Sequence, residues 1–140
     1  MMSISLARRW LQILAVIHII GGLLLPIMVY TPLAAPYFQH LQTAFPDSNP
    51  ESLRFLIGVF GPTVASWGLL FFYAIVKAFE SRTRQDWWLL VSATLVWAVL
   101  DTALSFANHV AAHLYLNGSV LVLFLIPLLL TKKHFKSQTT

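Results

Sequence analysis

The sequence predicts an all-α protein: a four-helix transmembrane bundle with a short interfacial helix in its first outer loop. Three observations predict this fold class. Of the 140 residues, 58% are hydrophobic and only 10% are charged, whereas an average soluble domain has about 25% charged residues. The apolar residues gather in four long stretches, and the basic residues gather in alternate connections. This composition excludes a water-soluble domain, a disordered chain and a basic nucleic-acid-binding domain.

The four apolar stretches are close to the length of about 20 residues that a bilayer-crossing helix needs. We expect residues 1–140 to form one integral membrane domain, with spans at about 10–30, 55–79, 87–108 and 114–131. In the first span only Gln12 and His18 are polar. The fourth span is short, so Asn117 must lie within its outer turns if the helix is to cross without thinning the bilayer.

The basic residues predict the orientation of the bundle. Eight of the nine lie before the first span, at the inner end of the second span or between it and the third, or after the fourth: Arg8, Arg9, Lys77, Arg82, Arg84, Lys132, Lys133 and Lys136. Only Arg54 lies in the other connections. By the positive-inside rule, both termini are cytoplasmic. We therefore expect a plasma membrane protein, with a bacterial inner membrane favoured, whose excess charge faces lipid headgroups rather than nucleic acid.

The first outer loop, about 31–54, is the longest segment between spans. Within it Phe38, Leu41 and Phe45 recur at helical spacing on one face. This pattern predicts a short amphipathic helix in the outer headgroup region. The helix is either a lid over the mouth of the bundle or a simple anchored connector, and the sequence does not separate the two.

A helix start is predicted just after that loop. Ser48 or Asn49 can cap it, while Pro50 suits the first turn and Glu51 is favourable near a helix N-terminus. The second span should therefore begin as a helix before it reaches the apolar run. At the other end of the chain, the polar tail 137–140 is expected to be disordered.

Asp101 is the only acidic residue inside a predicted span. An ionised carboxylate is costly in hydrocarbon, so such residues face the bundle interior and mark ligand, ion or proton sites. The alternative is a helix–helix hydrogen bond made by a structural, protonated Asp101. The two interpretations carry equal weight on the sequence alone.

A polar stripe surrounds Asp101 on the third span. Trp97, Ser105, Asn108 and His109 share its helical face. Measured from the outer ends of the spans, Gly21, Gly22, Pro62 and Thr63 reach about the depth of Asp101, and Asn117 is shallower. We predict an outward-facing crevice with Asp101 at its floor and glycines and a proline in its walls. Its candidate ligand-binding residues are Asp101, Ser105, Asn108, His109, Trp97, Thr63 and Asn117. Close packing without a crevice is the alternative.

A second pattern on the second span predicts helix packing. Its small residues follow one seam, which lets helix backbones approach closely: Gly58, Gly61, Ala65 and Gly68. The sequence leaves open whether another span, a second copy of the chain or a membrane partner protein occupies this seam.

No cofactor or metal is expected. The chain has no cysteine, which excludes thiolate metal sites, iron–sulfur clusters and disulfide exchange. His109 and His113 have the spacing of helical metal ligands, but no third ligand is evident, so they are weak candidates. His18 has no histidine at matching depth on another span, which argues against haem.

The sequence favours a non-enzymatic membrane module that binds a small amphipathic ligand, a lipid or a partner protein around Asp101. No nucleophile or phosphate-binding motif is present, so an enzyme is disfavoured. Three alternatives remain: an intramembrane enzyme using Asp101 with Ser105 or His109 as acid and base, an oligomeric small transporter, and an accessory subunit of a membrane complex.

Overall fold

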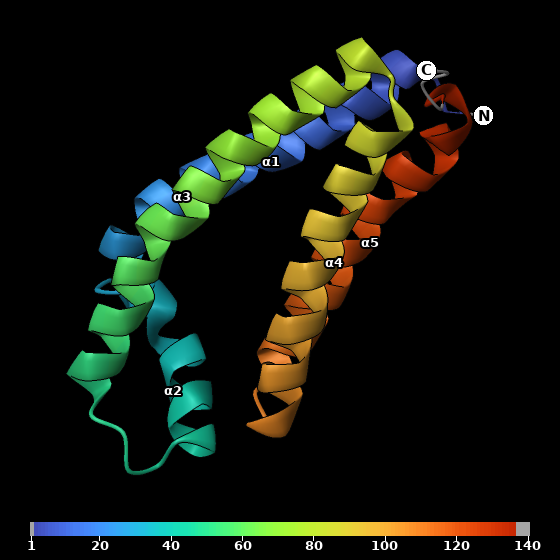
Figure 1. Cartoon of the computed structure of the whole chain (residues 1–140). Helices are drawn as coiled ribbons and strands as arrows, with labels where there is room; N and C mark the ends of the chain where they lie inside the picture. Colours follow the sequence, from blue (N-terminus) through green and yellow to red (C-terminus); the bar gives the residue numbers. More distant parts are fainter. Residues whose placement is uncertain (1, 137–140) are drawn as a thin grey trace.

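The computed structural model describes residues 2–136, and within that range every regular element is helical (Figure 1). The predicted tail, 137–140, lies outside the described residues. Four helices are long and apolar enough to cross a membrane. The elements, in chain order, are α1 (Ile4–Met28), η1 (Pro32–Ala34), α2 (Ala35–Ala44), α3 (Pro50–Ser81), α4 (Arg84–Ala107), α5 (Ala111–Thr131) and η2 (Lys132–His134).

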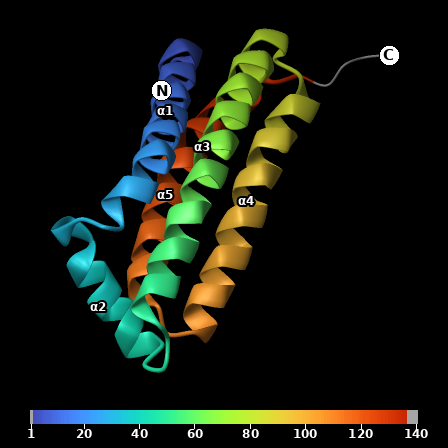
Figure 2. The same ribbon diagram turned by 90° about the vertical axis from the view of Figure 1, so that its left-hand side faces the viewer.

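The long helices alternate in direction, so the eight basic residues outside the first loop lie at one end of the molecule, here called the basic end. Figure 2 shows the N-terminus of α1, the connection from α3 to α4 and the end of α5 at that end. The opposite end, where α2 lies, is here called the α2 end. The positions of the helices thus confirm the charge asymmetry read from the sequence.

Helices α1 and α3 begin earlier than their apolar runs because polar residues cap and extend them. α1 starts at Ile4, where the Ser3 side chain accepts a hydrogen bond from the backbone of Leu6 at 3.2 Å. α3 starts at Pro50, and Asn49 is its cap, accepting from the backbone N–H of Glu51 at 2.8 Å. The predicted helix start before the second span is therefore confirmed.

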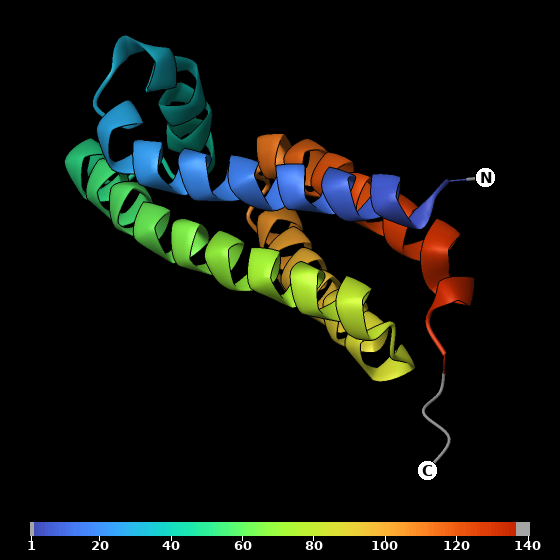
Figure 3. The same ribbon diagram turned by 90° about the horizontal axis from the view of Figure 1, so that it is seen from above.

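The closest pair of helices is α1 and α3, which lie along one another (Figures 1 and 3). Glycines make this approach possible. A Cβ atom added at Gly22 would lie 2.4 Å from the backbone nitrogen of Ala65 and 2.5 Å from the carbonyl oxygen of Gly61. One at Gly68 would lie 2.9 Å from the backbone nitrogen of Ile19. The small-residue seam of the second span is thus occupied by α1 of the same chain.

The main hydrophobic core is at the basic end, where all four long helices meet. Leu11 from α1, Ile75 from α3, Trp87 from α4 and Phe124 from α5 are all buried within it. The Trp87 indole N–H donates to the carbonyl of Leu128 at 2.9 Å, which ties α4 to α5. From this core the α1–α3 pair and the α4–α5 pair diverge toward the α2 end (Figure 1).

At the α2 end, α2 packs against the ends of the long helices. The segment predicted to be an amphipathic helix is helical, and Phe38 and Leu41 are buried as its apolar face. They form a second, smaller cluster with Val29 at the end of α1 and Val110 in the α4–α5 turn. The apolar face of α2 therefore packs on the protein itself.

Candidate functional site

A chain of three polar side chains links α2, α4 and α5 at the α2 end. The Tyr37 hydroxyl is 2.6 Å from His113 Nε2, and the Ser105 hydroxyl is 3.3 Å from His113 Nδ1. The Tyr37 and His113 rings also stack, with their centroids 5.7 Å apart. In a neutral imidazole one nitrogen donates and the other accepts, so both hydrogen bonds can form together.

Asp101 and Asn117 lie one helical turn deeper in the bundle than Ser105 and His113. Asp101 precedes Ser105 by four residues on α4, and Asn117 follows His113 by four residues on the antiparallel α5. Four residues of helix span about 6 Å, so the two side chains occupy one level below Ser105 and His113. Asn117 therefore lies about as deep as Asp101, and not shallower as the span ends read from the sequence suggested.

The deeper level contains polar groups that the protein leaves unsatisfied. Asn117 is only 2% exposed, and its side-chain Nδ2 has no hydrogen-bond partner within the described part of the chain. A buried donor in this state costs about 1–3 kcal/mol. Asp101 is half-buried, and across residues 2–136 it accepts no hydrogen bond. At this depth, therefore, α4 offers a carboxylate acceptor and α5 an amide donor.

Tyr37 lies close enough to Asp101 to experience its charge. Burial raises the pKa of the Tyr37 hydroxyl above its ordinary value of 10.0, and the negative charge of Asp101 raises it further. Tyr37 therefore remains a neutral donor and acceptor over the whole physiological range. It connects the α2 helix to the polar residues of α4 and α5.

The remaining predicted site residues are placed as follows. Trp97 is half-buried one turn below Asp101, with its ring centroid 6.5 Å from that of Trp67. Asn108 is exposed at the end of α4 and donates to the carbonyl of Leu104 at 2.8 Å. Thr63 is exposed on α3. Of the two glycines predicted for the crevice wall, Gly22 packs α1 on α3, and a Cβ atom added at Gly21 would meet nothing within 4 Å.

His109 and His113 are separated by a helix break. α4 ends at Ala107, and His109 adopts a left-handed conformation with φ 58° in the turn before α5. His109 is exposed, whereas His113 lies within hydrogen-bond distance of Ser105. Within residues 2–136 there is no group of three or more acidic or histidine side chains that could hold a metal ion.

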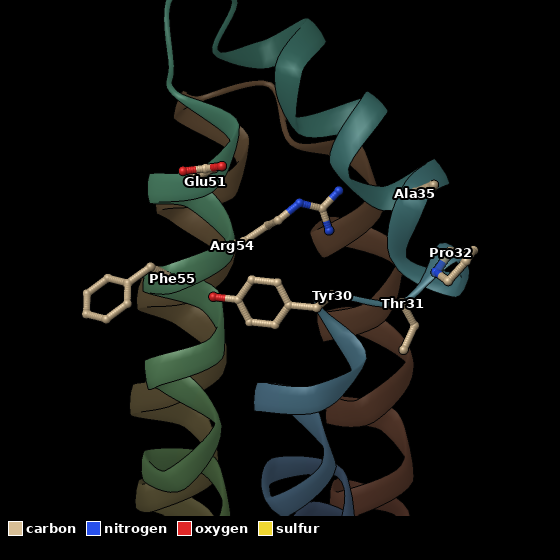
Figure 4. Close-up of a pocket in the computed structure, with 7 residues that line it drawn as sticks. All are labelled: Tyr30, Thr31, Pro32, Ala35, Glu51, Arg54 and Phe55. Atoms are coloured by element: carbon tan, nitrogen blue, oxygen red, sulfur yellow. The ribbon is translucent and has the colours of Figure 1, made fainter.

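A separate pocket of ≈ 710 Å³ opens at the junction of α1, α2 and α3 (Figure 4). Sequence reasoning missed it, because its walls come from three elements that only the fold brings together. The one sequence feature that pointed to this pocket was Arg54, because it is the single lysine or arginine at the α2 end of the molecule. The lining residues are Tyr30, Thr31, Pro32, Ala35, Glu51, Arg54 and Phe55.

Comparisons with protein-family models, with curated proteins and with solved structures found no match. Any functional conclusion therefore depends on the site itself.

Proposed function

We propose that this protein is an integral membrane module that binds a small amphipathic ligand at the α2 end, through the polar residues of α4 and α5. The proposal depends on one observation: Asp101 and Asn117 lie at a similar depth, and each has a polar group without a hydrogen-bond partner within residues 2–136. One is a half-buried carboxylate without a hydrogen-bond donor, and the other is a buried amide nitrogen without an acceptor, among the residues described. A ligand with a hydrogen-bond donor for Asp101 and an acceptor for Asn117 would satisfy both side chains.

The chemistry of the two side chains defines the head of the ligand. An ionised carboxylate only accepts hydrogen bonds, so Asp101 requires an ammonium or hydroxyl group. The Asn117 amide nitrogen only donates, so it requires an oxygen acceptor. The surrounding surface of α4 and α5 is apolar, with Leu100, Leu104 and Leu116 all about 60% exposed or more. A head with an amine or hydroxyl on an aliphatic tail fits these conditions.

The test measures binding of a long-chain amine, dodecylamine, to the full chain in a nonionic detergent. Asp101→Asn and Asp101→Leu remove the charge, and Asp47→Asn serves as the matched control because Asp47 is an exposed acid in the loop before α3. We expect the Asp101 variants to weaken binding about tenfold or more, as loss of a charge-assisted contact does. A lower Tm with unchanged amine binding would show that Asp101 is structural and would refute the ligand role.

We further propose that the basic end is cytoplasmic and that the membrane is a bacterial inner membrane. The support is the separation of eight basic residues from Arg54 along the bundle axis. The native chain has no cysteine, so single-cysteine variants report sidedness directly. Thr43→Cys on α2 should react with a membrane-impermeant thiol reagent in intact cells, whereas Lys133→Cys should react only after lysis. The reverse pattern would overturn the orientation.

A further inference from the structure

The pocket beside Arg54 is distinct from the Asp101 site and is built from different elements. Its walls come from the turn after α1, from η1, from the start of α2 and from the first turns of α3. Figure 4 shows the Arg54 side chain extending from α3 toward α2, with the Tyr30 ring on the side nearer α1. The residues that line the pocket include one cation, one anion and two aromatic rings, so both its charges and its apolar surface require an explanation.

Arg54 is held in place by the protein but retains capacity for a ligand. Its guanidinium donates to the backbone carbonyl of Val29 and lies over the Phe38 ring, 4.3 Å from the ring centroid. These contacts fix the orientation of a long side chain that is otherwise costly to immobilise. A guanidinium has five N–H donors in a planar fork, so several remain after the bond to Val29. Such a fork matches the oxygens of a phosphate.

Glu51 brings the opposite charge to the same pocket. It precedes Arg54 by three residues on α3, so the two side chains share a helical face. Both residues belong to the described part of the chain, and no ion pair within 4 Å joins them. Glu51 lies in the first turn of α3, where an acidic residue is favoured by the helix dipole. The dipole does not explain why a cation and an anion line one pocket without forming an ion pair. That arrangement is complementary to a zwitterion.

The aromatic residues place this pocket where a lipid headgroup would lie. Tyr30 is 66% exposed and Phe55 is 60% exposed, and both sit at the ends of apolar helices. Tyrosine is enriched at the headgroup level of membranes. Below them the exposed surfaces of α1 and α3 are apolar, with Ile27 66% and Val59 55% exposed. Acyl chains can lie along this surface while the headgroup occupies the pocket.

We propose that this pocket binds the phosphoethanolamine group of a membrane phospholipid, with the phosphate on Arg54 and the ammonium on Glu51. The same group also exists as free phosphoethanolamine, which lacks acyl chains. Because Phe55 and the apolar surface below it contribute to binding only when acyl chains are present, the lipid is the ligand we assign.

The test uses the full chain in nonionic detergent and counts bound molecules by native mass spectrometry as each probe is titrated. The probes are short-chain phosphatidylethanolamine, phosphatidylglycerol, diacylglycerol and free phosphoethanolamine. We expect saturable binding of phosphatidylethanolamine, roughly tenfold tighter than of phosphatidylglycerol, because one charge-assisted contact distinguishes them. Equal affinity for both phospholipids, saturable binding of diacylglycerol, or free phosphoethanolamine binding as tightly as the lipid would each overturn the assignment.

Two substitutions separate the roles of the charges. Arg54→Gln should weaken both phospholipids at least tenfold, whereas Glu51→Gln should remove only the preference for ethanolamine over glycerol. Arg9→Gln, an exposed arginine at the basic end, is the matched control and should change neither. A preference that survives Glu51→Gln would contradict the role of Glu51.

A third variant keeps the proposal testable if Arg54→Gln does not fold, since that change also removes the contact to Val29. Ala35→Phe adds a ring from α2 into the pocket and leaves Arg54 unaltered. It should abolish the saturable lipid binding without changing dodecylamine binding at Asp101. Lipid binding equal to that of the wild type would refute the pocket as the site, independently of the Asp101 proposal.

Discussion

Gly22→Ala should weaken the contact between α1 and α3, and the adjacent Gly21→Ala should not. The Cβ atom added at Gly22 would lie 2.4 Å from the backbone nitrogen of Ala65 and 2.5 Å from the carbonyl oxygen of Gly61. Ordinary contacts of a Cβ atom begin at 3.4 Å, so the helices must separate by about 1.0 Å, the difference between 3.4 and 2.4 Å. Both obstructing atoms belong to the backbone, so no side-chain rotation relieves the overlap.

The magnitude follows from comparing the two glycines. Overpacking of a well-packed contact costs about 1–3 kcal/mol. Replacing glycine by alanine inside a helix returns up to about 1 kcal/mol, and both variants share this gain. At Gly21 nothing lies within 4 Å of the added Cβ. The difference between the variants therefore isolates the overlap at about 1–3 kcal/mol, which for a chain of this size is a Tm difference of roughly 3–10 °C.

The assay is thermal unfolding of each variant in the same detergent, followed by tryptophan fluorescence. Gly61→Ala provides an internal check, because its Cβ would lie 2.5 Å from the carbonyl oxygen of Gly22 at the same crossing. Once the helices have separated for one methyl group, the second costs less, so the double variant should lose less than the sum of the two. A Tm for Gly22→Ala equal to or above that of Gly21→Ala would refute the close α1–α3 packing.

Two further predictions concern the two ends of the molecule. Trp87→Phe removes the hydrogen bond to the carbonyl of Leu128 in the main core, and should lower the free energy of unfolding by about 1–3 kcal/mol in the same thermal assay; an unchanged Tm would show that this bond contributes nothing. At the α2 end, burial and the charge of Asp101 raise the pKa of the Tyr37 hydroxyl. The stability that the neutral Tyr37 hydroxyl contributes is therefore fully present below pH 10.0. It is lost as the pH rises through the raised pKa of Tyr37 in the folded protein. An absorbance titration should place the phenolate transition of Tyr37 above 10.0 and at lower pH in Asp101→Asn; no difference between the two proteins would contradict the proximity of Asp101.

The interiors of the spans were predictable because hydropathy alone identifies them. Their ends were not, since a helix continues past its apolar run wherever the backbone is capped. α1 thus begins at Ile4 and includes Arg8 and Arg9, although the apolar run begins at Trp10. The start of α3 at Pro50 was predictable because cap residues, unlike apolar ones, mark a helix end directly.

The site was predictable along each helix but not between helices. The spacing on α4 placed Asp101 and Ser105 on one face, as a helix period requires. The contact of Ser105 with His113 depends on the turn in which His109 takes a positive φ. That conformation is uncommon for any residue other than glycine, so the sequence alone does not predict the turn. The contact from Tyr37 joins residues 76 positions apart and exists only because α2 folds back on the bundle.

The convergence of the four helices at the basic end gives the molecule unequal cross-sections. Placed in a bilayer, a body whose helix pairs meet at one end and diverge at the other occupies more area in one leaflet than in the opposite one (Figure 1). Lipids around such a wedge-shaped protein are least strained in a curved membrane whose convex, expanded leaflet holds the α2 end. We therefore expect the reconstituted protein, oriented with α2 outward, to favour small vesicles over large ones. Equal partitioning between the two sizes would show that the two helix pairs close together in lipid.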